Sequence, residues 1–218
     1  MSYLPPPERK ITAGTFRLAV LLFTCVIVAS NYLVSFKIGS IYIPLVDITL
    51  NLTHVTYGAL TYPISFLIMD ILSEKYARKD VLRALRYGLL CAFLPSCAIA
   101  FISNDPHIAF RIAIASVSAF FIAQFLDVML FYRLKNRFPS LWWLRNGASA
   151  CMAQCIDTFI FFHIAFLGIL PYYDVFMLFL FDYAIKSFVN FLDIPIFYFL
   201  AIKTYKQFSL HKILLKKK

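Results

Sequence analysis

The sequence contains one short polar pattern twice within long apolar stretches. Gln124 stands three residues before Asp127, and Gln154 stands three residues before Asp157. On a helix, residues three apart lie on the same face about one turn from each other. A carboxylate at bilayer depth costs roughly 2.5–3.5 kcal/mol even on lenient insertion scales. We therefore expect these side chains to face the interior of a helix bundle or a wet cavity rather than lipid.

Two interpretations of this repeated motif remain open. The simpler one is structural: the glutamines bond to each other and the aspartates bond to Ser or Thr, which holds the helices together. The other is a pseudo-symmetric substrate site near the membrane midplane, because repeated helices of carriers often meet there. A planar heterocycle suits such a site, since carboxylates accept from ring N–H groups and carboxamides both donate and accept. Nearby aromatic residues could stack on its faces, namely Phe121, Phe125, Phe159 and Phe162.

The composition is that of an integral membrane protein. Hydrophobic residues make up 61% of the 218 residues, and only 15% are charged. Lys and Arg outnumber Asp and Glu, 21 to 11, but they fall in short clusters between apolar runs. This distribution indicates membrane topology rather than direct binding of nucleic acid.

Stretches of about 20 apolar residues predict an all-α polytopic protein with six transmembrane helices. They follow a cytoplasmic N-terminal tail, residues 1–16, and form a transport domain over residues 17–202, before a basic cytoplasmic C-terminal tail over 203–218. The loop Ile41–Thr53 is expected to be a short extended or re-entrant segment, because apolar and polar residues alternate there. The six predicted spans are Leu18–Phe36, Val55–Glu74, Tyr87–Ser103, Ile112–Tyr132, Asn146–Gly168 and Tyr172–Ile202.

The positive charges predict the orientation of these spans. If the N-terminus is cytoplasmic, every Lys and Arg except Lys37, Arg111 and Lys186 falls in a segment on the cytoplasmic side. Such a bias is typical of cytoplasmic loops, so we expect both termini inside. The five cysteines lack the spacing of a metal site and are expected to be small buried apolar residues.

Two further groups of charged residues lie inside predicted spans. Asp70 and Glu74 are four residues apart in the second span. Pro63, seven residues before Asp70, removes one helix hydrogen bond, so we expect the upper half of this helix to bend around a cavity. Glu74 could pair with Lys75 or Arg78 at the interface, whereas Asp70 lies deeper and has no evident basic partner within one turn.

The sixth span carries Asp182 and Lys186 four residues apart, a spacing that allows an ion pair, then Asn190 and Asp193. At roughly 45 Å this span is longer than the hydrocarbon core, so it must tilt, protrude or break near Pro195.

Several runs resemble the signatures of the queuosine precursor transporters, in the vitamin uptake transporter family. The longest is the run from Tyr57 to Asp70, which continues to Glu74, Lys75 and Tyr76. Lys75 and Ala77 depart from the pattern of the family. The other matching positions are Ser30, Asn31, Tyr32, Arg111, Gln124, Asp127, Arg145, Gln154, Asp157, Thr158, Phe161, Lys186, Asp193, Ile194 and Pro195.

The resemblance implies a bacterial inner-membrane importer of 7-deazaguanines, such as 7-cyano- and 7-aminomethyl-7-deazaguanine, with queuine as a variant. Such a base presents an N–H and an amino group on one edge, which an Asp can accept as a bidentate pair. Asp127 or Asp157 is the candidate for that edge. Gln124, Gln154 and Asn31 are candidates for the oxo and ring-nitrogen positions.

The remaining embedded charges are candidates for proton coupling or gating. Asp70 is the first choice for carrying a proton, because a buried unpaired carboxyl favours its protonated form. The other candidates are Glu74, Arg111, Asp182, Lys186 and Asp193. No cofactor or metal is expected, and no enzyme motif is present. An alternative is a substrate-binding membrane component of an ATP-driven vitamin uptake system, which would work with a partner ATPase.

Overall fold

The computed structural model describes residues 9–33, 36, 38–43, 48–51, 56–103 and 106–203, and these residues form a helical bundle with one small hairpin. The helices are α1 (Ala13–Leu33), α2 (Tyr57–Thr61), α3 (Pro63–Lys75), α4 (Arg78–Ser103), α5 (Pro106–Arg137), α6 (Trp142–Phe166) and α7 (Tyr172–Phe197), which continues as a short π-helix, η1 (Tyr198–Lys203). The strands are β1 (Ser40–Ile43) and β2 (Ile48–Asn51).

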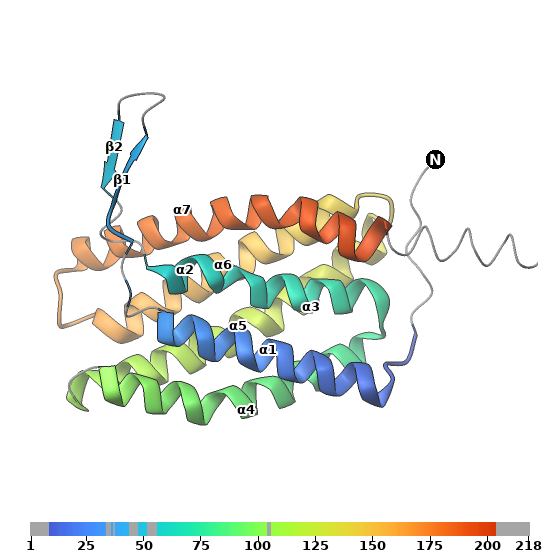
Figure 1. Ribbon diagram of the computed structural model, residues 1–218, viewed down its shortest axis with the longest axis horizontal. Coiled ribbons are helices and arrows are strands. Elements are labelled where there is room, and N and C mark those ends of the chain that lie inside the picture. Colours follow the sequence, from blue (N-terminus) through green and yellow to red (C-terminus); the bar gives the residue numbers. More distant parts are fainter. Residues whose placement is uncertain are drawn as a thin grey trace, which may run out of the picture.

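The long helices lie side by side and run alternately in opposite directions (Figure 1). The start of α1 and the end of η1 lie at the same end of the bundle, and the hairpin lies at the opposite end. Among the described elements, α5 and α6 pack against each other most extensively. Both copies of the Gln-x-x-Asp motif therefore lie on one antiparallel helix pair.

Five helices are long and apolar enough to cross a membrane: α1, α4, α5, α6 and α7. The remaining predicted span, Val55–Glu74, is not one continuous helix, because the chain divides into α2 and α3 at Pro63. Proline has no N–H and cannot complete the helical hydrogen bond at this position. The structure thus has a break between two helices at Pro63 where a bend within one helix was expected, and five of the six predicted spans are continuous helices of membrane length.

The loop after α1 contains the expected extended segment. β1 and β2 pair antiparallel, with Ser40 opposite Asn51 and Ile43 opposite Ile48. Pro44 and Asp47 of the predicted segment lie outside the described residues. The all-α prediction is thus right for the bundle, and the hairpin is its one described exception.

The end of α7 changes its helical geometry shortly after Pro195. The α-helix continues to Phe197, and the π-helix η1 follows, with the N–H of Tyr198 donating to the carbonyls of Ile194 and Pro195. Proline removes one hydrogen bond from the helical ladder, and π-type turns often accommodate such a defect. Lys75, which departs from the family signature, donates from Nζ to the Leu200 carbonyl of η1 at 3.0 Å.

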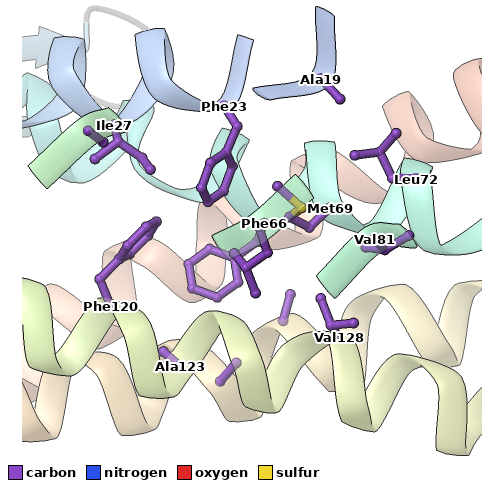
Figure 2. Close-up of a cluster of buried hydrophobic side chains, with 14 of the residues drawn as sticks. Ala19, Phe23, Ile27, Phe66, Met69, Leu72, Val81, Phe120, Ala123 and Val128 are labelled. Atoms are coloured by element: carbon purple, nitrogen blue, oxygen red, sulfur yellow. The ribbon is translucent and has the colours of Figure 1, made fainter. Parts of the chain in front are cut away.

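The larger apolar core lies between α1, α3, α4 and α5, and small residues of α6 also contribute to it (Figure 2). Phe23 of α1 stacks on Phe120 of α5 at 5.8 Å between ring centroids, and Phe66 of α3 meets Phe120 edge-on at 6.3 Å. Gly88 of α4 is required by this packing, since a Cβ at this position would overlap the Phe23 ring. Close approach of α1 and α4 thus depends on the absence of a side chain at Gly88.

The distribution of polarity is reversed relative to a soluble protein. Large apolar side chains such as Leu94 and Phe188 are exposed, by 74% and 65%, whereas charged residues such as Glu74 and Arg145 are fully buried. An apolar exterior suits contact with lipid. Cys25 and Cys91 are also exposed, so the prediction that the cysteines are buried is wrong for these two.

Candidate functional site

The four residues of the repeated motif all face the interior of the bundle, as expected. Gln124, Asp127 and Gln154 are completely buried, and Asp157 is 3% exposed. The helical spacing of three residues places each pair on the inward face, while the rest of the helix surface meets lipid or other helices. Burial alone fits both interpretations of the motif, so the partners of each side chain decide between them.

The antiparallel packing separates the two aspartates along the bundle axis. The Asp127 carboxyl lies beside Ser149 of α6. Asp157 is eight residues further along α6, which corresponds to about 12 Å at a rise of about 1.5 Å per residue. The two glutamines lie between these levels. The repeat therefore gives a central pair of carboxamides flanked by two carboxylates in different surroundings.

Asp157 is fully engaged in a network of charges. Its Oδ1 accepts from the Tyr62 hydroxyl at 2.9 Å, and its Oδ2 lies 3.4 Å from Lys186 Nζ. Lys186 also forms the predicted ion pair with Asp182, at 2.7 Å, and donates to the Thr158 hydroxyl at 3.3 Å. Lys186 thus pairs with two carboxylates, and Tyr62 and Lys186 together provide a partner for each oxygen of Asp157.

Asp127 has a contrasting environment. It lies close to the carboxyl of Asp70 on α3, and no ion pair to a cation is found for either residue in the described part of the chain. Asp70 accepts from Asn146 Nδ2 at 2.5 Å through Oδ2. Asp70 Oδ1 and both oxygens of Asp127 are buried without a hydrogen-bond partner among the described residues. Two buried carboxylates side by side cannot both be ionised at a tolerable cost.

The glutamines also have unused hydrogen-bonding capacity. Gln124 Nε2 donates to the Ser65 hydroxyl at 3.1 Å, and Ser65 in turn donates to the Tyr62 carbonyl at 2.8 Å. Gln124 Oε1 and both polar atoms of Gln154 have no partner within the described ranges. A buried amide without a partner costs roughly 1–3 kcal/mol, so these groups disfavour a purely structural role. The Gln-to-Gln bond of that interpretation is not found between them.

Glu74 corrects one expectation. It pairs with Arg145 of α6, not with Lys75 or Arg78: Arg145 Nε and Nη2 donate to the two carboxylate oxygens at 2.9 and 2.8 Å. Lys135 caps the same end of α3, donating from Nζ to the carbonyls of Ser73 and Glu74 at 2.9 Å. Arg145 and Lys135 counted as cytoplasmic loop charges in the sequence, yet both are buried. Bidentate pairing inside the bundle explains why Arg145 tolerates this position.

The other candidate residues lie apart from this centre. Asn31 bonds to Ser96 of α4 at 2.7 Å between Nδ2 and Oγ. Arg111 donates to the carbonyls of Ile164 and Leu167, at 3.0 and 2.8 Å, and so caps the end of α6. Asp193 is 5% exposed, and its Oδ2 has no partner among the described residues.

Three of the four aromatic residues expected to stack at the site lie on the outside of the bundle, and the fourth, Phe162, is half-buried. Phe121, Phe125 and Phe159 are 53%, 43% and 45% exposed, because they lie on the outer faces of α5 and α6. Tyr62 comes closest to the polar residues: its ring lies 4.6 Å from Lys186 Nζ and 5.1 Å from the Phe120 ring. Tyr62 and Asn146 were not predicted from the sequence as site residues, although each is directly adjacent in the sequence to a residue that was noted there, Pro63 and Arg145 respectively.

A multi-pass helical bundle with an apolar exterior and unpartnered polar groups at its centre defines a membrane transport protein. The comparisons with known proteins agree. Residues 56–200 match the family described as "Putative vitamin uptake transporter", and the chain belongs to this family.

Three relatives have closely similar sequences. A "Probable queuosine precursor transporter" of Bacillus subtilis is 33% identical over 174 residues, covering 72% of this chain and 73% of the relative. A protein of the same name from Haemophilus influenzae is 32% identical, covering 65% of each. The "Queuosine precursor transporter" of Escherichia coli K12 is 30% identical, covering 65% of this chain and 64% of the relative. No solved structure matches the chain significantly.

Proposed function

We propose that this protein imports queuosine precursors of the 7-deazaguanine class across the bacterial inner membrane. The observation that carries the proposal is the buried set of unpartnered polar atoms on Gln124, Asp127 and Gln154, at the centre of the bundle. The names of the three relatives support the same substrate class. The family is one of transporters, so the activity is transport rather than catalysis.

The partners of the two aspartates favour different roles for them. Among the described residues, Asp127 has no cation as an ion-pair partner, and neither of its oxygens has a hydrogen-bond partner, so it can accept a bidentate pair from the N1–H and 2-amino groups of the base. Gln124 and Gln154 then meet the oxo group and a ring nitrogen. Asp157 is already held by Tyr62 and Lys186, so its role is to fix the position of α6 against α7 and the α2–α3 junction.

The experiment is an uptake assay in bacteria that can neither make nor import these bases. Cells expressing the protein receive 7-cyano-7-deazaguanine, 7-aminomethyl-7-deazaguanine or queuine, and queuosine in transfer RNA is measured. We expect queuosine to appear with at least one precursor and only in expressing cells. No queuosine with any precursor, despite protein in the membrane, refutes the proposal. Uptake by the purified protein in vesicles without ATP tests the further point that no partner ATPase is needed.

We also propose that α2 and α3 together form a sixth membrane crossing, with both termini in the cytoplasm. The two helices succeed one another along the bundle, and α1 begins where η1 ends, which fits an even number of crossings (Figure 1). In a cysteine-free background, an impermeant thiol reagent outside the cell should label Tyr173→Cys and not Asn136→Cys. Both positions are exposed at opposite ends of the bundle, and labelling of Asn136→Cys alone would reverse the orientation.

Transport is proposed to be coupled to protons through Asp70 and Asp127. Asn146 and Ser149 of α6 face the pair, and Glu74, the nearest other carboxylate on α3, is neutralised by Arg145. Because no cation pairs with either carboxyl among the described residues, we propose that the two carboxyls share one proton. When Asp127 accepts the base, the proton resides on Asp70, so base and proton occupy neighbouring groups and move together.

A further inference from the structure

A cavity of about 350 Å³ lies between α1, α4 and α5, away from the motif residues. Its volume is at the small end of the range of about 300–1,000 Å³ found for small-molecule sites. Most of its wall is apolar or aromatic. The motif residues Gln124, Asp127, Gln154 and Asp157 do not line it, so it is a separate space from the buried polar centre.

The polar side chains of this cavity are few. One is charged, the exposed Arg86 of α4, and the others are neutral hydrogen-bonding groups. Asn31 of α1 and Ser96 of α4 bond to each other across it, and Ser116 and Ser118 of α5 add two hydroxyls. Within the described residues the Asn31 carboxamide makes no other hydrogen bond, so its oxygen is available to accept. Next to Ser96, Pro95 removes one backbone hydrogen bond from α4. An acyl chain would make no use of these groups, whereas a polar aromatic ring would.

Tyr62 connects the cavity with the polar centre. It belongs to the cavity wall, together with Phe120, and its hydroxyl reaches across to Asp157. It also stands at the junction of α2 and α3, where Pro63 interrupts the helix. A rotation at this junction would break the hydrogen bond from Tyr62 to Asp157. It would also move the Tyr62 ring, which stands between the cavity and the buried polar centre.

We propose that this cavity is a first binding site for the planar base, and that Tyr62 is the gate between it and the central site. The proposal rests on the proposed function and adds a second binding place and the order in which the two are occupied. The base first stacks beside Tyr62 and Phe120, and Asn31 accepts from a ring N–H. The base then passes to the central site formed by Gln124, Gln154 and Asp127. Asn31, expected from the sequence to belong to one site with the motif residues, thus acts at an earlier one.

The first test fills the cavity. Ser116→Phe should reduce uptake of 7-cyano-7-deazaguanine by about tenfold or more, equivalent to about 1.4 kcal/mol of lost binding. Ile114→Phe places a phenylalanine on α5 at a position that is 44% exposed and does not line the cavity, so it is the matched control and should transport within about twofold of wild type, an effect below about 0.5 kcal/mol. Both variants must reach wild-type levels in the membrane. Wild-type uptake by a folded Ser116→Phe protein overturns the proposal.

The second test does not depend on the folding of a bulky variant. In a cysteine-free protein that still transports, Ser118→Cys is labelled with a small maleimide, with and without saturating 7-cyano-7-deazaguanine. We expect the base to slow labelling at Ser118→Cys and to leave Asn136→Cys, at the far end of α5, unchanged. Equal labelling with and without the base shows that the base does not enter the cavity.

The gate is tested with Tyr62→Phe, which keeps the ring and removes the hydroxyl. Without the bond to Asp157 the ring moves more readily, so protection of Ser118→Cys should persist while the transport rate changes at least about twofold, a difference of about 0.4 kcal/mol in barrier height. An unchanged rate removes the gate from the proposal. If wild-type protein imports none of the bases, the proposed function fails. If wild-type protein does transport, but Ser116→Phe and Tyr62→Phe leave transport unchanged and the base does not slow labelling of Ser118→Cys, this inference alone is refuted.

Discussion

Replacing Asp127 with asparagine should abolish most uptake without weakening the fold. The side chain keeps its shape, but one acceptor oxygen becomes a donor that faces the donors of the base. A buried donor left without an acceptor costs roughly 1–3 kcal/mol. This corresponds to a loss of about tenfold to a hundredfold in uptake at subsaturating substrate.

The stability of the same variant follows from its neighbour. Two unit charges about 4 Å apart repel by roughly 4 kcal/mol at an effective dielectric constant of about 20, and this repulsion is the reason for proposing that the Asp70–Asp127 pair keeps a proton. Asparagine resembles the protonated acid and relieves this constraint. The unfolding temperature of Asp127→Asn in detergent should therefore equal or exceed that of wild type.

Asp157→Asn is the matched control, because it makes the same change in the other copy of the motif. It removes an ion pair with Lys186, which keeps Asp182 at 2.7 Å as its remaining partner. We expect a loss of about 1–3 kcal/mol in stability, because a buried charge-assisted hydrogen bond is replaced by a neutral one. Wild-type uptake by Asp127→Asn, or a loss of stability equal to that of Asp157→Asn, would refute the assignment of separate roles to the two aspartates.

Three other expectations follow from the same contacts. Glu74→Gln should lower the free energy of unfolding by about 3–5 kcal/mol, because it leaves Arg145 buried without its counter-charge, and urea unfolding in detergent micelles measures this. Asp70→Asn should keep exchange of the base across vesicle membranes but lose accumulation driven by a pH gradient, and no response of wild-type protein to that gradient would end the proton proposal. Gly88→Ala should destabilise the bundle by about 1–3 kcal/mol through overlap with Phe23, and Phe23→Leu should restore part of the loss in a thermal unfolding assay.

Sequence reasoning was most successful where a local pattern sets the structure. Apolar stretches of membrane length predict helices because a bilayer leaves no other way to satisfy the backbone. The interruption at Pro63 and the ion pair of Asp182 with Lys186 also follow from local chemistry, namely a missing N–H and a spacing of four residues. The inward orientation of Gln124 and Gln154 follows in the same way, since polar side chains are costly in lipid.

The tertiary structure alone decided which charged groups on different helices meet. Glu74 and Arg145 are 71 residues apart, and only the packing of α3 on α6 makes them partners instead of the nearer Lys75. The two Gln-x-x-Asp copies look equivalent in the sequence, yet Lys186 approaches one aspartate and Asp70 the other. Helical spacing fixes the face on which a side chain lies, because it depends on local geometry. The charge opposite that face depends on which helix packs there and at what height, and this is a property of the whole bundle.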